Sequence, residues 1–251
     1  MKLLDTLLDL LFPEKCPFCR RVQDAPGICP DCMKSLPWTD EAGGLRELEP
    51  GLFCAAPLWY TGSVREAVRR FKFRGGVGAA GPLGGLIAQA AAQRFPGRFD
   101  VVTWVPVSAR RLRKRGYDQS LLLAESACAL WGVQPERLLR KIRDNPAQSS
   151  LKDAAARWKN TRRAYRPAGD AEGKRVLLID DVCSTGSTLC SCARTLRAAG
   201  AAEIVCAAAA FPQPDPEKTR EKKRKKWLAI WERRQYNVSC NFMDWRAEFR
   251  P

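Results

Sequence analysis

Residues 176–188 of this chain place two carboxylates between an apolar run and a turn rich in hydroxyl groups and glycine. The apolar residues 176–179 predict a buried strand, and Asp180 and Asp181 follow at its carboxyl end. Apolar side chains then recur at helical spacing over residues 189–199. A strand, a short turn and a helix in this order predict one unit of an α/β fold.

The turn of residues 183–188 carries groups that bind anions. Backbone N–H groups at the start of a helix point toward a ligand, and the helix dipole favours negative charge there. Carboxylates beside this position would repel a bare phosphate, so we expect Asp180 and Asp181 to contact neutral hydroxyls, directly or through Mg²⁺. A ligand with a phosphate at one end and a cis-diol nearby is a ribose 5-phosphate. The alternative is an ordinary strand–turn–helix unit in which Ser or Thr caps the helix.

Length and composition indicate a globular protein. The 251 residues, 45% hydrophobic and 28% charged, suffice for one α/β domain with a large core and small attachments. Apolar stretches all fall short of the roughly 20 residues that span a bilayer, and we expect a cytoplasmic protein. The chain has no histidine, which excludes His-based triads, His-ligated catalytic zinc and imidazole bases. An enzyme of this sequence must therefore rely on positioning and electrostatics, or on carboxylates, Lys or Cys.

The net charge of +16 is concentrated in three segments, residues 104–117, 137–166 and 212–251. The first two precede the acidic pair in sequence and would suit a polyphosphate or a nucleic-acid strand around it. Charge runs are also common on solvated faces. We keep that interpretation for the third segment, which resembles an exposed helix or a disordered tail.

Four of the eleven cysteines form two Cys-x₂-Cys knuckles, at Cys16 and Cys19 and at Cys29 and Cys32. Two knuckles so close together are typical of a closed tetrahedral zinc site, in which thiolates fill every coordination position. Disulfides are disfavoured in a cytosolic chain, and an iron–sulfur cluster uses the same ligands but usually at other spacings. We therefore predict structural zinc without catalysis at the metal. Cys183 lies in the anion-binding turn, where we expect a spacer and not a nucleophile.

Predicted strands and helices alternate along the rest of the chain, which implies a mainly parallel sheet with ligands at the carboxyl ends of its strands. Loops 105–108 and 180–188 both leave such ends. Apolar patterns predict helices over residues 64–71, 82–94 and 121–131, and strands over residues 99–107, 134–143, 164–166 and 203–211.

The run 176–188 resembles the phosphoribosyl-pyrophosphate (PRPP) signature of type I phosphoribosyltransferases. Over residues 1–211 the chain further resembles the competence protein F (ComF) family, in the order of its motifs as much as in any single one. Asp118 stands where that family usually has Asn, which adds an acid near the expected pyrophosphate site. The matching motifs are the four zinc-knuckle cysteines, Phe71-Lys72-Phe73-Arg74-Gly75, Val105-Pro106-Val107-Ser108, Arg115-Gly116-Tyr117-Asp118-Gln119, and Gln148, Leu151, Arg157 and Asn160.

This resemblance implies an α/β fold with a mainly parallel sheet of the type I phosphoribosyltransferase kind and a small N-terminal zinc-binding module. Residues 1–14 would form an amphipathic docking helix and residues 15–56 the zinc module. Residues 57–211 would form the phosphoribosyltransferase-like domain. Residues 212–251 are a basic C-terminal extension outside the family pattern, to which we assign no role.

The resemblance also implies a site for PRPP with Mg²⁺, in addition to the zinc. Asp180 and Asp181 take the catalytic positions at the ribose hydroxyls. The loop 107–110 would bind pyrophosphate, with Arg110 or Arg111 countering its charge, and residues 148–160 would close over PRPP as a hood. For Tyr117 and Gln119, packing and capping at a helix start compete with ligand contact. The expected ligand-binding residues are Cys183, Ser184, Thr185, Gly186, Ser187, Thr188, Val107, Ser108, Arg110 and Lys72.

Two functions follow from these expectations. The first is an enzyme that moves a ribose 5-phosphate group from PRPP to an acceptor. The second is a non-catalytic accessory protein of DNA uptake, which binds single-stranded DNA or a competence helicase with the same fold. The family resemblance links both to natural transformation, and aromatic residues among the basic segments would allow base stacking.

Overall fold

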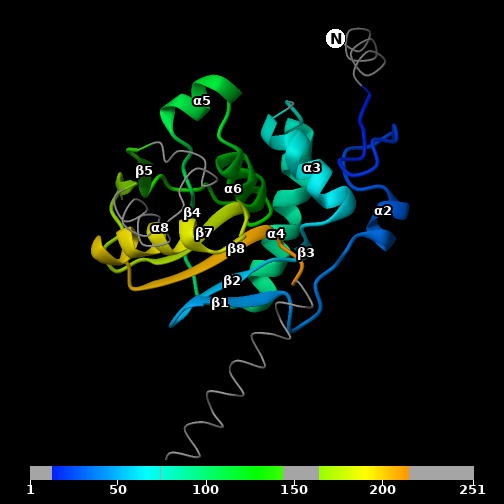
Figure 1. Cartoon of the computed structure of the whole chain (residues 1–251). Helices are drawn as coiled ribbons and strands as arrows, with labels where there is room; N and C mark the ends of the chain where they lie inside the picture. The colour runs from blue at the N-terminus through cyan, green and yellow to red at the C-terminus, as the bar shows by residue number, and fades with distance from the viewer. Residues whose placement is uncertain (1–12, 74, 144–163, 215–251) are drawn as a thin grey trace, which may run out of the picture. The chain divides into compact units, whose positions relative to one another are not determined.

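The computed structural model describes residues 13–73, 75–143 and 164–214, and its main feature is a six-stranded sheet (Figure 1). The strand order is β1-β2-β8-β7-β4, and β3 pairs with β8. Every pairing is parallel except that of β1 with β2, so the predicted α/β class with a mainly parallel sheet is confirmed. The strands are β1 (Leu45–Glu49), β2 (Leu52–Ala55), β3 (Leu58–Trp59), β4 (Val101–Trp104), β7 (Arg175–Val182) and β8 (Glu203–Phe211).

The central strands β7 and β8 are buried on both faces, as expected for apolar strands inside a parallel sheet. Successive side chains of β7 belong to two different cores, because residues alternate between the faces of a strand. Leu177 and Ile179 join the first core, whereas Val176 and Leu178 join the second. The two cores therefore lie on opposite sides of the sheet.

Helices α3 (Gly62–Phe73), α4 (Ala80–Arg94) and α6 (Gln119–Ala129) contribute to the first core, and α8 (Ser187–Ala198) to the second. A Cβ on Gly84 of α4 would lie 2.5 Å from Ser126 Cβ of α6, so the glycine permits the close packing of these two helices. The predicted helices of the first core are all present, and each begins two residues earlier than predicted. The sequence pattern marks only the first apolar residue of a helix.

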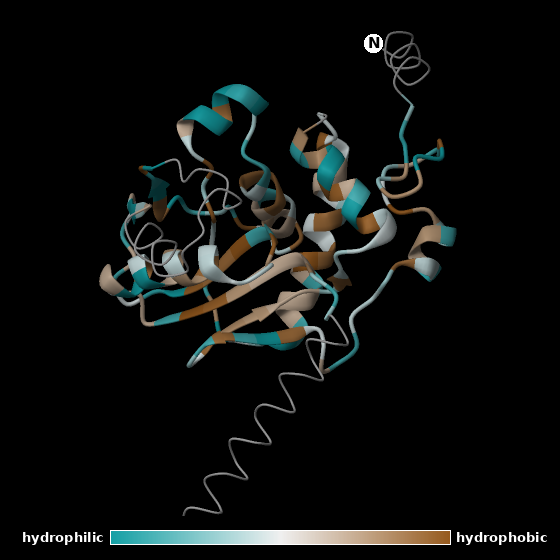
Figure 2. Cartoon of the chain, viewed as in Figure 1, coloured by the Kyte–Doolittle hydropathy of each residue, from teal (hydrophilic) through white to brown (hydrophobic). Residues whose placement is uncertain are grey.

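The strand predicted over residues 99–107 is only four residues long in the structure, β4. Val105 N still donates to Ile179 O at 2.9 Å, but the next residue, Pro106, has no N–H with which to continue the ladder. The chain leaves the sheet there, enters the short helix α5 (Ala109–Arg115) and returns to α6. None of the side chains of α5 is buried, and the helix is hydrophilic over nearly its whole length (Figure 2).

The strand predicted over residues 134–143 does not join the main sheet. Only β5 (Leu139–Lys141) is a strand, and it pairs antiparallel with β6 (Tyr165–Pro167) in a separate two-stranded sheet. Residues before β5 instead run beside β4, where Glu136 N donates to Val102 O at 2.8 Å. The two strands flank the segment predicted as a hood.

The N-terminal module contains the short helix α2 (Pro30–Ser35), and the 3₁₀ turn η1 (Val77–Ala79) follows α3. The expected docking helix, apart from residues 13 and 14, lies outside the described residues. So do the hood of residues 148–160 and the extension beyond residue 214. Within the described ranges, no helix has the length and apolar character needed to cross a bilayer.

Candidate functional site

The four knuckle cysteines come together in one cluster. The sulfur atoms of Cys16, Cys19, Cys29 and Cys32 all lie within 4.8 Å of one another, and Cys19 Sγ is 3.7 Å from Cys29 Sγ. Burial raises the pKa of the Cys16 thiol, but hydrogen bonds from the backbone of Cys19 and Cys29 outweigh it and lower this pKa to about 6. Four thiols at this separation fit a tetrahedral Zn²⁺.

Local backbone geometry forms each knuckle. In the first knuckle (residues 16–19), Arg20 N donates to Cys16 O at 3.0 Å, and Arg20 itself adopts a left-handed φ of 70°. In the second, Cys29 is the N-cap of α2, and Pro30 supplies the fixed φ that suits a first helical position. A tight turn and a helix start thus direct two pairs of thiols toward one point.

A second site lies at the carboxyl ends of β4 and β7, where a cavity of about 180 Å³ opens. Two carboxylates and four cationic side chains line this cavity, and they come from elements far apart in sequence. Such a mixture of charges fits a polyanionic ligand that also carries hydroxyl groups. The lining residues are Lys72, Val105, Pro106, Val107, Arg111, Arg115, Gln119, Lys141, Tyr165, Asp180, Asp181, Val182 and Thr188.

Asp181 is the less accessible of the two acids, with 4% of its surface exposed. Its Oδ1 pairs with Lys72 Nζ of α3 at 2.9 Å. Its Oδ2 is buried and has no hydrogen-bond partner among the described residues. Buried polar atoms are almost always paired, so this oxygen, beside a cavity, marks a position for a ligand group or a metal ion.

Asp180 is held by two donors. Its Oδ1 accepts hydrogen bonds from Ser120 Oγ at 3.1 Å and from Asp181 N at 2.9 Å. Burial, followed by the neighbouring charge of Asp181, raises the pKa of Asp180 to about 7. The acid pair (Asp180 and Asp181) therefore faces the cavity with constrained carboxylates. An oxygen-rich donor set of this kind fits Mg²⁺, which prefers carboxylate and phosphate oxygens.

Asp118 fixes the loop that borders the cavity on the β4 side. Its Oδ2 accepts from Val107 N at 3.0 Å and from Trp104 Nε1 at 3.3 Å. Its Oδ1 caps α6 by accepting from Ser120 N at 3.1 Å and Leu121 N at 3.3 Å. Burial raises the pKa of Asp118 although these bonds oppose the rise. Both carboxylate oxygens of Asp118, the acid expected near pyrophosphate, thus accept hydrogen bonds that hold this loop and the start of α6.

In the predicted anion-binding turn (residues 183–188), Gly186 is the N-cap of α8 and adopts a left-handed conformation with φ 76°. No side chain caps this helix, so the ordinary capping interpretation does not describe it. Ser184 and Thr185 are exposed, while Cys183 is 98% buried, consistent with a spacer. Of the turn residues, only Thr188 reaches the lining of the cavity.

The structure places the two arginines considered for pyrophosphate, Arg110 and Arg111, differently with respect to the cavity. Arg111 and Arg115 line the cavity, whereas Arg110 does not. Ser108 is engaged as the N-cap of α5, where its Oγ accepts from Arg111 N at 3.3 Å. Val107 and Lys72 line the cavity. The contact of all these residues with PRPP stays a prediction.

Lys141 and Tyr165 were not predicted as site residues. They lie on β5 and β6, and Lys141 Nζ is 5.2 Å from the centre of the Tyr165 ring. Burial raises the pKa of Tyr165 strongly. No motif marks either residue. Both flank the segment predicted as a hood, and this position is the one sequence feature that could have indicated them as site residues.

Two protein families match different parts of this chain. Residues 108–241 match the phosphoribosyl transferase domain family, and residues 7–43 match the double zinc ribbon domain. The chain belongs to the phosphoribosyl transferase domain family. Among the described residues of the zinc ribbon match, one complete set of four cysteine ligands is present.

Curated relatives confirm the predicted resemblance to the ComF family. The protein is 28% identical to competence protein ComFC of Bacillus subtilis over 190 residues, which are 76% of this chain and 74% of that protein. It is also 28% identical to the DNA utilization protein YhgH of Salmonella typhimurium over 208 residues, an alignment that covers 75% of this chain and 86% of that protein. A solved phosphoribosylpyrophosphate synthetase from Mycobacterium smegmatis matches at 21% identity and a TM-score of 0.34, over 54% of this chain and 35% of that chain.

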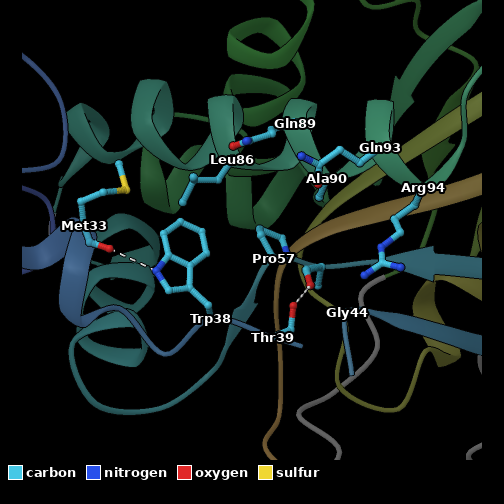
Figure 3. Close-up of a pocket in the computed structure, with 11 residues that line it drawn as sticks. Met33, Trp38, Thr39, Gly44, Pro57, Leu86, Gln89, Ala90, Gln93 and Arg94 are labelled. Carbon is cyan, nitrogen blue, oxygen red and sulfur yellow. Dashed lines mark hydrogen bonds between the residues drawn. The ribbon is translucent and has the colours of Figure 1, made fainter. Parts of the chain in front are cut away.

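The protein has another pocket, of about 370 Å³, between α4 and the segment that follows α2 (Figure 3). Trp38 lies at its base with the indole held in place, because Nε1 donates to Met33 O at 3.1 Å. Gln89, Gln93 and Arg94 of α4 line the opposite side, and no carboxylate is among the lining residues. The lining therefore combines an aromatic ring with two amides and a guanidinium.

Proposed function

We propose that this protein binds PRPP with Mg²⁺ in the cavity beside the acid pair and transfers the ribose 5-phosphate group to an acceptor. The observation that carries the proposal is Asp181 Oδ2, which is buried and has no hydrogen-bond partner among the described residues, beside a cavity that four cations also line. The carboxylates suit the hydroxyls of the ribose. The cations suit pyrophosphate, which a cavity of carboxylates alone would repel.

In the proposed reaction, the bond from ribose C1 to pyrophosphate breaks, and pyrophosphate leaves with the electron pair. A bond forms from C1 to the nucleophilic atom of the acceptor, whose proton passes to solvent or to a basic group of the acceptor complex. Arg111 and Arg115 stabilise the charge that develops on pyrophosphate, and the acid pair orients the ribose through its hydroxyls. Mg²⁺, held by Asp180 and Asp181, would supply further positive charge for the leaving group.

The relatives supply the biological setting of the proposal. Their names, competence protein ComFC and DNA utilization protein YhgH, support a role of this chain in competence and DNA uptake. We further propose a competence helicase as a partner, which the family resemblance implies. We also propose a cytoplasmic location. Ten described cysteines are free thiols, and thiols and a thiolate zinc site both persist in a reducing compartment.

A second candidate function is the binding of single-stranded DNA without catalysis. The exposed α5 carries five Lys or Arg side chains in seven residues, next to the cavity that Arg111 and Arg115 line. Trp38 offers a partly exposed indole on which a base can stack. Phosphate contacts from α5 would give this binding a steep dependence on salt.

Calorimetric titration with PRPP and Mg²⁺, together with an assay for released pyrophosphate, tests the first proposal. Wild-type protein should bind PRPP, and the variant Asp180→Asn with Asp181→Asn should lose that binding while retaining its far-UV circular dichroism spectrum. Salt-dependent binding of a labelled oligonucleotide in the same samples tests the second. Unchanged PRPP affinity in the double variant would contradict the site assignment.

A further inference from the structure

The last turn of α3 connects the zinc module to the cavity. Arg70 Nη2 donates to Pro17 O at 2.7 Å and to Phe18 O at 3.2 Å, and both carbonyls belong to the first knuckle (residues 16–19). Two residues further along the helix, Lys72 reaches the cavity and forms an ion pair with Asp181. A single helical turn therefore contacts a zinc knuckle with one cation and the candidate site with another.

Apolar packing makes this connection stiff. Phe18 of the first knuckle is 4% exposed and belongs to the same core as Val64, Ala67 and Phe71 of α3. The hydroxyl of Tyr117 donates to Phe71 O, so the loop after α5 is attached to the same turn of α3. Packed cores transmit displacements because they do not deform continuously.

The end of α3 is also closely enclosed on the side of the following loop. Gly76 N donates to Arg70 O at 3.3 Å, and a Cβ on Gly76 would lie 3.2 Å from the carbonyl carbon of Arg70. The turn that carries Arg70 and Lys72 thus has little freedom to rotate while the knuckle carbonyls stay in place. Loss of zinc would loosen the knuckle, because in the described part of the chain no disulfide joins its thiols, and the 3.7 Å contact between Cys19 Sγ and Cys29 Sγ is weak.

We propose that Arg70 is a positioning residue that couples zinc occupancy to ligand affinity at the acid pair. Zinc fixes the knuckle carbonyls, the carbonyls fix Arg70, and the last turn of α3 then holds Lys72 against Asp181. This inference rests on the proposed function, since PRPP is the ligand whose affinity zinc regulates. Linkage makes the effect reciprocal: PRPP strengthens zinc retention by the factor by which zinc strengthens PRPP binding.

The test compares Arg70→Ala with Arg69→Ala as the matched control, because Arg69 belongs to an exposed pair with Glu66 on the same helix. PRPP affinity with Mg²⁺ should fall about 5- to 20-fold in Arg70→Ala, the size of a typical coupling between sites, and stay unchanged in Arg69→Ala. Arg70→Lys should restore affinity, because a single nitrogen makes both contacts with the knuckle.

Two further comparisons separate coupling from general destabilisation. In a Lys72→Met background, Arg70→Ala should cause no additional loss of PRPP affinity. Removing zinc with a chelator should weaken PRPP binding in the wild type and leave it unchanged in Arg70→Ala. Equal losses in both backgrounds, or the same effect of zinc removal with and without Arg70, would overturn the proposal.

Hydrogen exchange gives a readout that does not need PRPP. Zinc removal should increase amide exchange over the last turn of α3 in the wild type, and Arg70→Ala should show the same increased exchange with zinc still bound. If wild-type protein does not bind PRPP, the proposed function fails while exchange still decides the coupling. If exchange in this turn ignores both zinc and Arg70, the coupling fails whatever PRPP does.

Discussion

Lys72 Nζ lies 2.9 Å from Asp181 Oδ1, whereas Oδ2 of the same carboxylate is buried without a partner among the described residues. Burial tends to lower the pKa of Lys72, but the charge of Asp181 and its hydrogen bond outweigh that effect and leave the pKa raised. Lys72 therefore stays cationic at neutral pH. Within the described residues, the protein thus pairs one oxygen of Asp181 and not the other.

Replacing Lys72 with Met should destabilise the protein, because it leaves the carboxylate of Asp181 buried and uncompensated. We expect the free energy of unfolding to fall by about 1–3 kcal/mol, below the full cost of breaking a buried pair because Lys72 is partly exposed. Urea denaturation at pH 7 measures the change, and Lys34→Met, at an exposed position, is the control. Adding Asp181→Asn should recover part of the loss. If Lys72→Met alone is as stable as the wild type, the ion pair contributes nothing to the free energy of unfolding.

Asp118→Asn should weaken both the fold and the site. All four partners of Asp118 are N–H donors, and an amide presents an NH₂ group where one carboxylate oxygen now accepts two of them. Leaving those donors unsatisfied should cost about 1–3 kcal/mol.

Chemical denaturation measures this cost, and pyrophosphate affinity reports the position of the loop at Val107. Asp24→Asn, at an exposed position, should leave both quantities unchanged. Wild-type stability and affinity in Asp118→Asn would mean that the loop is held by other contacts.

The sequence predicted the strand, turn and helix of residues 176–188 well, because each is encoded by a local pattern. It left Arg110 and Arg111 as alternatives, because the orientation of α5 decides which side chain faces the cavity. Helix α5 is capped by Ser108 and ends at Gly116, and in this orientation Arg111 and Arg115 line the cavity. Lys141 and Tyr165 depend on the pairing of β5 with β6, which no periodicity within either short segment reveals.

Zinc analysis tests the N-terminal module. Reduced, freshly purified protein should contain about one zinc per chain, because one complete thiolate set is present. Cys29→Ser with Cys32→Ser should lose the metal and lower the melting temperature, since these side chains belong to the core that also contains α3. Cys128→Ser, a buried cysteine outside the cluster, should retain the zinc. Absence of zinc from the wild type, with iron in its place, would favour the iron–sulfur alternative.

Gly186 tests the anion-binding turn. Its φ of 76° favours glycine, and an added Cβ would lie 2.8 Å from Leu48 Cδ2. Gly186→Ala should therefore lower the free energy of unfolding by about 1–2 kcal/mol through backbone strain, with the contact against Leu48 adding to the cost, and it should weaken the affinity for inorganic phosphate.

Leu48→Ala should relieve only the steric part of this loss, so Gly186→Ala with Leu48→Ala should be more stable than the sum of the two single effects predicts. Gly173→Ala is the control, because Gly173 also has a positive φ of 67° but open space around it and lies outside the site. It should lose stability without losing phosphate affinity. Equal phosphate affinity in Gly186→Ala and Gly173→Ala would show that the turn does not bind the phosphate.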